Sequence, residues 1–273
     1  MRGRRALRVV ASVAVIVTGL YIFCVIGLTL AQRKLIYHPC KSSAAQLEVA
    51  ARKASFQIWR NSAGEAIGWF RAGQSRRSIL LLHGNTGCAP DWFHYADGFL
   101  AVEAMDFYIL EYPGYGGRKG KAKQEEILRA AENGFASITN KCAVYLVGES
   151  LGTGVAAYLA GKYGDGVRGI FLVAPYNNMM AVAKSHLPLF PIKLMLKDKY
   201  PASEWLQNFH GPVGVLLAEK DTTVPSDLGR DLFEKYAGPK KLWIEPGATH
   251  GNVHKPRSSL WKEVQDFWKE GKQ

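Results

Sequence analysis

The stretch that decides the fold is AVYLVGESLGTGV, residues 143–155, where an apolar run leads into a serine between two glycines. The run Ala143–Val147 is apolar on both faces, which is typical of a strand buried inside a parallel sheet. Gly148-Glu149-Ser150-Leu151-Gly152 follows at once, and a helical pattern begins at Leu151. This order of strand, sharp turn and helix predicts that Ser150 stands on a nucleophile elbow.

The glycines of this turn have a physical reason. Side chains two positions before and after the serine would collide in so sharp a turn, and Gly148 and Gly152 carry none. We expect Gly154 to let the helix pack close to the sheet. The start of a helix behind Ser150 also favours negative charge that develops beside the serine.

Similar apolar runs recur along the chain and predict the remaining strands. The predicted strands are Phe56–Trp59, Ala66–Arg71, Ser78–Leu82, Phe107–Leu110, Ala143–Val147, Ile170–Val173, Val213–Leu217 and Leu242–Ile244. Helical patterns lie between them at about 91–104, 124–138, 151–163, 226–237 and 257–270. This alternation predicts an α/β fold, a mostly parallel eight-stranded sheet with helices on both faces, over residues 55–273.

The N-terminal region predicts a membrane anchor. Residues 9–30, VVASVAVIVTGLYIFCVIGLTL, carry no charge and would span about 33 Å as a helix, against a hydrocarbon core of about 30 Å. We therefore expect an anchor at 1–31 and a tether at 32–54. A cleaved signal peptide is the alternative, with Thr29-Leu30-Ala31 as its cleavage site, although the apolar run is longer than such signals usually have.

The charge pattern bears on orientation and on partners. Four arginines precede the apolar run and only Arg33 and Lys34 follow it closely, which favours a cytoplasmic N-terminus and a periplasmic or other extracytoplasmic catalytic domain. These six charges account for half of the net charge of +12, and the remainder is spread thinly. No nucleic-acid motif is present, so we expect no nucleic-acid partner. A hydrophobic content of 48% argues against a disordered chain.

The cysteines do not form a disulfide framework. Cys24 lies in the apolar run, and Cys40, Cys88 and Cys142 can form at most one disulfide within the chain, with the pairing left open. No CxxC motif or His/Cys cluster suggests a metal site, and we expect neither a metal nor an organic cofactor.

Residues 176–210 form the longest interval without a predicted strand. They are rich in Met, Leu and Phe and are broken by Pro188, Pro191 and Pro201. A structureless loop of this length is uncommon in a compact domain, so we expect a small helical lid over a pocket. The alternative is that these residues only complete the core.

A serine nucleophile requires a base and an acid that orients the base, and both candidates follow predicted strands. Asp221 comes just after Val213–Leu217, with Glu219 and Asp227 as alternatives. His250 lies in a glycine-flanked loop after the last strand, with His254 as its alternative. The order Ser, Asp, His is the one expected for an elbow serine in this kind of sheet.

An oxyanion hole completes the predicted site. The loop Leu82-His83-Gly84-Asn85-Thr86-Gly87 closes a central strand, and its backbone can supply one donor. We expect the backbone amides of Asn85 and Leu151 to hold the oxyanion of a tetrahedral intermediate. His83 precedes Gly84, and we expect it to brace the loop rather than act as the base.

With these parts in order, residues 35–270 resemble the membrane-anchored serine hydrolases of the α/β-hydrolase superfamily. The likeness is greatest to the lysophospholipase- or esterase-like subgroup with one N-terminal anchor. Besides the segments above it rests on Tyr112-Pro113-Gly114-Tyr115-Gly116 and Asp221-Thr222-Thr223-Val224-Pro225. Ala218 and Glu149 depart from the residues common in such proteins.

The resemblance and the triad together predict cleavage of a carboxylic ester or thioester. Ser150 would attack the carbonyl, His250 would move the proton, and Asp221 would orient His250. The anchor and the apolar 176–210 segment suggest a lipid-like acyl substrate. A serine peptidase and a non-catalytic, membrane-tethered binding protein are the alternatives.

Overall fold

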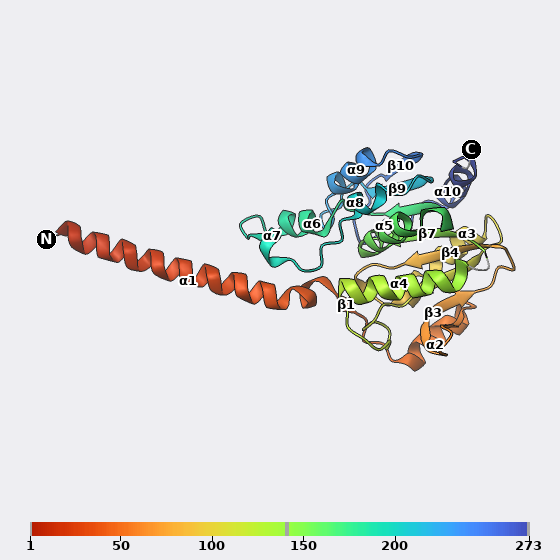
Figure 1. Cartoon of the computed structure of the whole chain (residues 1–273), viewed down its shortest axis with the longest axis horizontal. Coiled ribbons are helices and arrows are strands. Elements are labelled where there is room, and N and C mark those ends of the chain that lie inside the picture. Colours follow the sequence, from red (N-terminus) through yellow and green to blue (C-terminus); the bar gives the residue numbers. More distant parts are fainter. Residues whose placement is uncertain (1, 140–141, 272–273) are drawn as a thin grey trace.

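The apolar runs pair into one eight-stranded sheet in a computed structural model of the chain, which describes residues 2–139 and 142–271 (Figure 1). The strands are β2 (Gln57–Arg60), β3 (Ala66–Arg71), β4 (Arg77–Leu82), β6 (Asp106–Leu110), β7 (Ala143–Glu149), β8 (Val167–Val173), β9 (Val213–Ala218) and β10 (Lys240–Glu245). Their order across the sheet is β10-β9-β8-β7-β4-β6-β3-β2. The pairs β2–β3 and β3–β6 are antiparallel and the others are parallel, so the mostly parallel α/β sheet is confirmed.

Helices cover both faces of this sheet, and successive residues of a strand alternate between them. Leu80 and Leu82 of β4 belong to one buried cluster, and Ile79 and Leu81 belong to the other. One face packs against α4 (Gln124–Thr139), α5 (Leu151–Tyr163) and α9 (Ser226–Lys235), and the other against α2 (Ala44–Lys53), α3 (Phe93–Leu100) and α10 (Ser259–Glu270). Burial on both faces explains why the strands read as continuous apolar runs.

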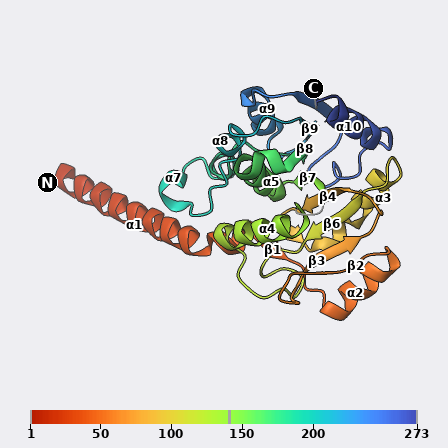
Figure 2. The same ribbon diagram turned by 45° about the vertical axis from the view of Figure 1, so that its right-hand side comes forward.

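The first helix, α1 (Arg2–Ile36), projects from the domain (Figures 1 and 2). Within residues 2–139 and 142–271 it is the one helix long and apolar enough to cross a membrane, over Leu7–Ile36. It contains the predicted span of 9–30 but continues past the expected boundary at residue 31. Ala31–Ile36 contains no Gly or Pro that would end the helix.

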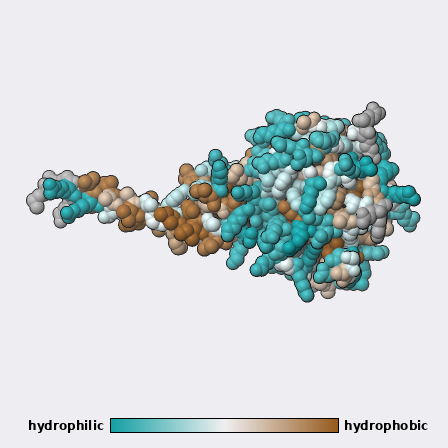
Figure 3. Space-filling model, viewed as in Figure 1, coloured by the Kyte–Doolittle hydropathy of each residue, from teal (hydrophilic) through white to brown (hydrophobic). Residues whose placement is uncertain are grey.

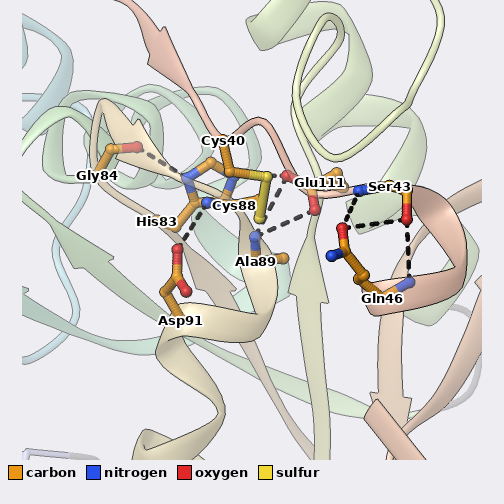
Figure 4. Close-up of a disulfide and its surroundings, with 9 residues drawn as sticks. All are labelled: Cys40, Ser43, Gln46, His83, Gly84, Cys88, Ala89, Asp91 and Glu111. Atoms are coloured by element: carbon orange, nitrogen blue, oxygen red, sulfur yellow. Dashed lines mark hydrogen bonds and ion pairs between the residues drawn. A yellow bond between two sulfur atoms is a disulfide. The ribbon is translucent and has the colours of Figure 1, made fainter. Parts of the chain in front are cut away.

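The segment expected as a tether, residues 32–54, is folded. After α1, β1 (His38–Pro39) pairs in parallel with β5 (Thr86–Gly87), and Cys40 forms a disulfide with Cys88 (Figure 4). The helix α2 then begins at a capping box, in which Ser43 Oγ accepts from the Gln46 amide and Gln46 Oε1 accepts from the Ser43 amide. Leu47 and Ala51, four residues apart on one face of α2, are buried in the core, which holds this segment on the domain.

Residues 176–210 divide into two parts. The helix α7 (Ile192–Met195) lies beside α1 (Figures 1 and 2) and contacts α6 (Met179–His186), whereas α8 (Ala202–Leu206) packs against α5. Leu206 and Phe209 are buried in the main core. The second part therefore completes the core, as the alternative interpretation held, whereas the lid expected for the first part stays a prediction.

Candidate active site

Three parallel strands bring the predicted catalytic side chains to one edge of the sheet. Ser150 directly follows β7, Asp221 lies three residues after β9, and His250 lies five residues after β10. The loops after parallel strands meet at the carboxyl end of the sheet, which is where ligands bind in open α/β folds. This placement joins Ser150 to a histidine 100 residues away in the chain.

The three side chains form a continuous chain of hydrogen bonds. His250 Nδ1 donates to Asp221 Oδ2 at 2.7 Å, so that Nε2 can accept from Ser150 Oγ at 3.0 Å. The other carboxylate oxygen of Asp221 accepts from the amides of Thr223 and Val224, at 2.9 and 2.8 Å. The side chain of Asp221 is 1% exposed and that of His250 is 20% exposed. The acid is thus fixed and buried, while the imidazole can be reached from the site.

Ser150 sits in a strained turn. Its φ is +49° and its ψ is −115°, a backbone conformation that a residue with a side chain rarely adopts. Its amide donates to the Val173 carbonyl of β8 at 2.9 Å, and its carbonyl accepts from the Thr153 amide at 3.0 Å. These hydrogen bonds fix the strained backbone of Ser150 between the sheet and the first turn of α5.

The glycines beside Ser150 are required by backbone atoms. A Cβ at Gly148 would lie 2.6 Å from the Gly152 carbonyl oxygen, and a Cβ at Gly152 would lie 1.8 Å from the Leu82 carbonyl oxygen. The obstacle at each position is therefore the backbone of α5 or of β4, not the side chain that we expected across the turn. At Gly154 a Cβ would lie 2.4 Å from the hydroxyl of Tyr176, so this glycine makes room for residues 176–210 rather than for the sheet.

The alternative acids and bases have other partners. Glu219 Oε2 accepts from the Gly247 amide at 2.7 Å and so holds the turn that leads to His250. Asp227 lies in the first turn of α9, where a carboxylate suits the helix dipole. The carbonyl of His254 accepts from His94 Nε2 at 3.0 Å, and burial lowers the pKa of the His254 ring.

The predicted oxyanion loop lies against the serine. A Cβ at Gly84 would lie 3.7 Å from the Ser150 Cβ, and Asn85 and Leu151 line the same pocket as Ser150. The side chain and the backbone carbonyl of Asn85 both make hydrogen bonds. Nδ2 donates to the Ile36 carbonyl at 2.6 Å, and the backbone carbonyl accepts from the His38 amide at 2.8 Å. The loop is thereby tied to the end of α1.

An apolar pocket of about 250 Å³ opens at Ser150. Its walls come from α1, from the turn after β7, from α6 and α7, and from the loop after Asp221; they include Leu28, Ile36, Met179, Val182, Met195 and Val224. Polar groups are few among the lining residues.

No group of three or more His, Cys, Asp or Glu side chains that could hold a metal ion occurs in the part of the chain that the structure describes.

Comparison with known proteins assigns this fold to one family. The α/β-hydrolase fold family matches residues 77–204. An uncharacterised protein of Mycobacterium tuberculosis, Rv2307c, is 30% identical over 262 residues, which cover 91% of this chain and 89% of that protein. The chain belongs to the α/β-hydrolase family. Proteins similar to it include a lipase and, at the level of the fold, an esterase.

Two of these proteins show how far the similarity extends in sequence and in structure. The lysophosphatidylserine lipase ABHD12 of Danio rerio is 28% identical over 210 residues, which cover 68% of this chain and 54% of the lipase. The chain thus matches about half the length of that protein. The esterase Pf2001 of Pyrococcus furiosus superposes with a TM-score of 0.63 at 15% identity, over 87% of this chain and 99% of the esterase. This second likeness shows a shared fold.

His83 and Glu111 are buried beside the predicted oxyanion loop. His83 is fully buried, and its Nδ1 donates to the Gly84 carbonyl at 2.8 Å (Figure 4). Its ring packs on Tyr112. Glu111 Oε2 accepts from the Ala89 amide at 3.1 Å. His83 therefore has the bracing position that we expected, while the buried Glu111 was not among the residues that sequence reasoning selected.

Glu149, which departs from the residues common beside such a serine, has a structural partner set. Its Oε2 accepts from Trp92 Nε1 at 2.7 Å and from the Tyr95 hydroxyl at 2.6 Å. Burial, with the charge of Glu149, raises the pKa of Tyr95, so its hydroxyl stays a donor. Glu149 thus joins the elbow to the start of α3. The sequence signal for this pairing was an acid at the end of an apolar strand, together with two aromatic donors, Trp92 and Tyr95, that lie close to each other in the chain.

Proposed function

We propose that this protein is a serine hydrolase that cleaves carboxylic esters or thioesters with a lipid-like acyl group. The observation that carries the proposal is the hydrogen-bonded chain from Asp221 through His250 to Ser150, set on a strained turn at the mouth of an apolar pocket. Activated serines in hydrolases have this arrangement of nucleophile, base and orienting acid. The lipase and esterase relatives support the same class of substrate.

In the proposed reaction Ser150 Oγ attacks the ester carbonyl while His250 Nε2 takes the serine proton. Asp221 holds the imidazole in the tautomer that keeps Nε2 free to accept, and its charge stabilises the imidazolium. The alcohol or thiol leaves with the proton from His250, and water then attacks the acyl-enzyme by the reverse of these roles. The two steps need only this chain's residues and water.

The oxyanion of each tetrahedral intermediate would lie between two backbone amides. Leu151 is the first residue of α5, where amides lack an intrahelical acceptor and the helix dipole favours negative charge. Asn85 would supply the second amide from the loop after β4. Loss of one such donor costs roughly 2.7–4 kcal/mol of transition-state stabilisation in other hydrolases.

We further propose that α1 is retained as a single-pass anchor, with the N-terminus in the cytoplasm and the hydrolase domain outside it. The excess of basic residues before the span supports this orientation. The disulfide between Cys40 and Cys88 supports it independently, because disulfides persist in oxidising compartments and are rare in the cytosol.

Fluorophosphonate labelling tests the chemistry. The detergent-solubilised wild type should be labelled, and Ser150→Ala and His250→Ala should not be, while all three keep the same circular dichroism spectrum. Turnover of short p-nitrophenyl esters should follow the labelling. A folded wild type that takes up no label would overturn the proposal and favour a binding protein.

A peptide panel separates the esterase from a peptidase on the same fold. We expect acyl esters to be hydrolysed while the peptides stay intact under the same conditions. Peptide cleavage that is lost in Ser150→Ala would instead assign the serine to a peptidase.

A further inference from the structure

The turn between α6 and α7 contacts α1 at Tyr21, well before the C-terminal end of that helix at Ile36. The hydroxyl of Tyr21 donates to the Leu189 carbonyl at 2.9 Å, and the ring of Tyr21 stacks on Phe190 with centroids 5.7 Å apart. Figures 1 and 2 show α7 alongside α1 in both views. The contact lies within the uncharged run of residues 9–30.

The position of this contact along α1 fixes where a membrane can lie. Only 12 residues of the uncharged run, Val9–Leu20, precede Tyr21. They rise about 18 Å as a helix, whereas the hydrocarbon core of a bilayer is about 30 Å thick. A bilayer spanned by α1 therefore extends past Tyr21 toward the hydrolase domain by about 12 Å.

We propose that residues 187–196, the membrane tip, form a second membrane-inserted element beside α1, and that the ester substrate reaches Ser150 directly from that bilayer. The second half of this proposal rests on the proposed esterase function. The occupant of the surface is the acyl and headgroup region of the leaflet that faces the hydrolase domain.

The exposed side chains of the membrane tip suit lipid. Leu189 is 82% exposed and Leu194 is 86% exposed, the two largest exposures of any leucine on the globular part of the described chain. Figure 3 shows hydrophobic surface on α1 and on the part of the domain that adjoins it. Exposed lysines at 184, 193 and 197 flank these leucines, and their long stems allow the ammonium groups to reach lipid phosphates.

Polar side chains of α1 satisfy backbone groups of the membrane tip. Besides the Tyr21 bond, Gln32 Nε2 donates to the Met195 carbonyl at 3.0 Å, and Gln32 Oε1 accepts from the amide of Lys197, the residue just after the tip, at 2.7 Å. An unpaired backbone group is strongly unfavourable in hydrocarbon, so irregular backbone at membrane depth requires such partners. These contacts let a non-helical turn lie beside a spanning helix.

The pocket at Ser150 shares its walls with the same two elements. Leu28, Leu35 and Ile36 of α1 line it on one side, and Ile192 and Met195 of the membrane tip line it on another. Leu28–Ile36 is the domain-side end of the candidate span, so the pocket opens at the level of the headgroups. An acyl chain that leaves the leaflet there can enter the apolar pocket without crossing water.

Fluorescence of a probe at Leu189 tests the insertion. Leu189→Cys is made in a background of Cys24→Ser and Cys142→Ala, which keeps the Cys40–Cys88 disulfide, and is labelled with the fluorophore NBD. The full chain is reconstituted in vesicles of phosphatidylcholine and phosphatidylglycerol. We expect the emission to be blue-shifted. We also expect nitroxide-labelled lipid to lower its intensity by at least a factor of two.

The matched control is Val49→Cys, an exposed apolar residue on α2, away from α1. Its probe should emit as in water and escape quenching. Equal, water-like emission from both positions would overturn the insertion of the membrane tip, whatever the activity of the enzyme.

Hydrolysis of two esters in the same vesicles tests the route of the substrate. The double variant Leu189→Glu, Leu194→Glu should hydrolyse membrane-dissolved 4-methylumbelliferyl palmitate at least tenfold more slowly than wild type. Its rate on water-soluble 4-methylumbelliferyl butyrate should stay within twofold. Val49→Glu should change neither rate.

The two arms separate the two proposals. An unchanged palmitate rate in the double variant would overturn delivery from the bilayer while the esterase function stood. Failure of the wild type on both esters would instead overturn the esterase function, and the probe at residue 189 would still report on insertion.

Discussion

Two regions of the molecule join parts of the chain that are far apart, but they do so by different means. The triad edge consists of the loops after β7, β9 and β10, and the anchor junction is the segment from the end of α1 to β5 together with its contacts to Asp198. At the triad edge, Ser150, Asp221 and His250 stand in loops at the carboxyl ends of parallel strands. At the anchor junction, Arg33 and Tyr37 bind Asp198, which lies 165 and 161 residues away in the chain. The sheet positions the first set of residues, whereas single side chains position the second.

This difference separates what each region controls. The triad edge rests on a core that all eight strands stabilise, so changes to its catalytic side chains should alter the reaction before they alter the fold, whereas a change to its tightly packed backbone should alter stability. The anchor junction rests on a few buried polar contacts and one disulfide, so changes there should alter stability before they alter the reaction. Each substitution below tests one side of this division.

The largest effect is expected at Asp221. In Asp221→Asn the amide favours the wrong imidazole tautomer, and kcat on a short p-nitrophenyl ester should fall by roughly 10⁴-fold, as in other triads. The midpoint of chemical unfolding should change little, because Asn can still accept from the amides of Thr223 and Val224. The control is Glu219→Gln, which keeps an acceptor for the Gly247 amide and should lower kcat by less than about threefold. A comparable loss in both variants would show that the loops of the edge act as one unit.

The next effect is expected at the disulfide of the anchor junction. The pair Cys40 and Cys88 is separated by 48 residues, and removing the link in Cys40→Ala, Cys88→Ala should lower the free energy of unfolding by about 4 kcal/mol. Equilibrium unfolding in urea measures this loss. Cys24→Ser, which changes an exposed thiol on α1, should leave the unfolding curve where it was. A stable double variant would mean that the pairing of β1 with β5 suffices to hold the segment.

The parts of the molecule that local pattern could predict are those that the sheet positions. The helix 151–163 has the bounds that its periodicity indicated, and each predicted strand overlaps an observed one. Ser150, Asp221 and His250 could be selected because strand ends carry them and because parallel strands share an edge. Elbow, acid loop and histidine loop are each recognisable within about five residues of sequence.

The anchor junction could not be predicted in the same way. Asp198 and Tyr37 carry no local sign of their contact, and three cysteines left the pairing of Cys40 with Cys88 open. The helix α2 is short and rich in alanine, so its two buried residues gave too weak a pattern to distinguish it from a tether. Each of these features depends on the path of the chain between α1 and β5, which periodicity does not report.

A smaller effect is expected at Gly152, where a side chain tests the rigidity of the edge. Gly152→Ala places a Cβ 1.8 Å from the Leu82 carbonyl oxygen, so the backbone of α5 or β4 must move. We expect a loss of about 3 kcal/mol in the free energy of unfolding. Gly251→Ala makes the same chemical change where no atom lies within 4 Å of the new Cβ, and it should cost less than about 0.5 kcal/mol. Similar losses in the two variants would contradict the close contact of α5 with β4.

The smallest effect is expected at Tyr37, and it tests the anchor junction most directly. The Tyr37 hydroxyl donates to Asp198 Oδ2 at 2.9 Å and lies 3.1 Å from the Tyr200 hydroxyl, and all three residues are buried. Burial raises the pKa of Tyr37, so the hydroxyl remains a donor throughout the physiological range. Tyr37→Phe leaves the buried carboxylate of Asp198 with one donor fewer, at a cost of about 2 kcal/mol in the free energy of unfolding.

The Tyr37 variant also distinguishes the two regions in a single protein. Because the hydrogen bond lies outside the triad, kcat on a short ester should stay within about twofold of the wild type while the urea midpoint falls. Tyr163→Phe, a half-buried tyrosine on α5 whose ring packs against Phe135, serves as the control and should move neither quantity by a measurable amount. A fall in kcat with Tyr37→Phe would instead show that the anchor junction acts on the oxyanion loop, through the bond from Asn85 to the Ile36 carbonyl one residue before Tyr37.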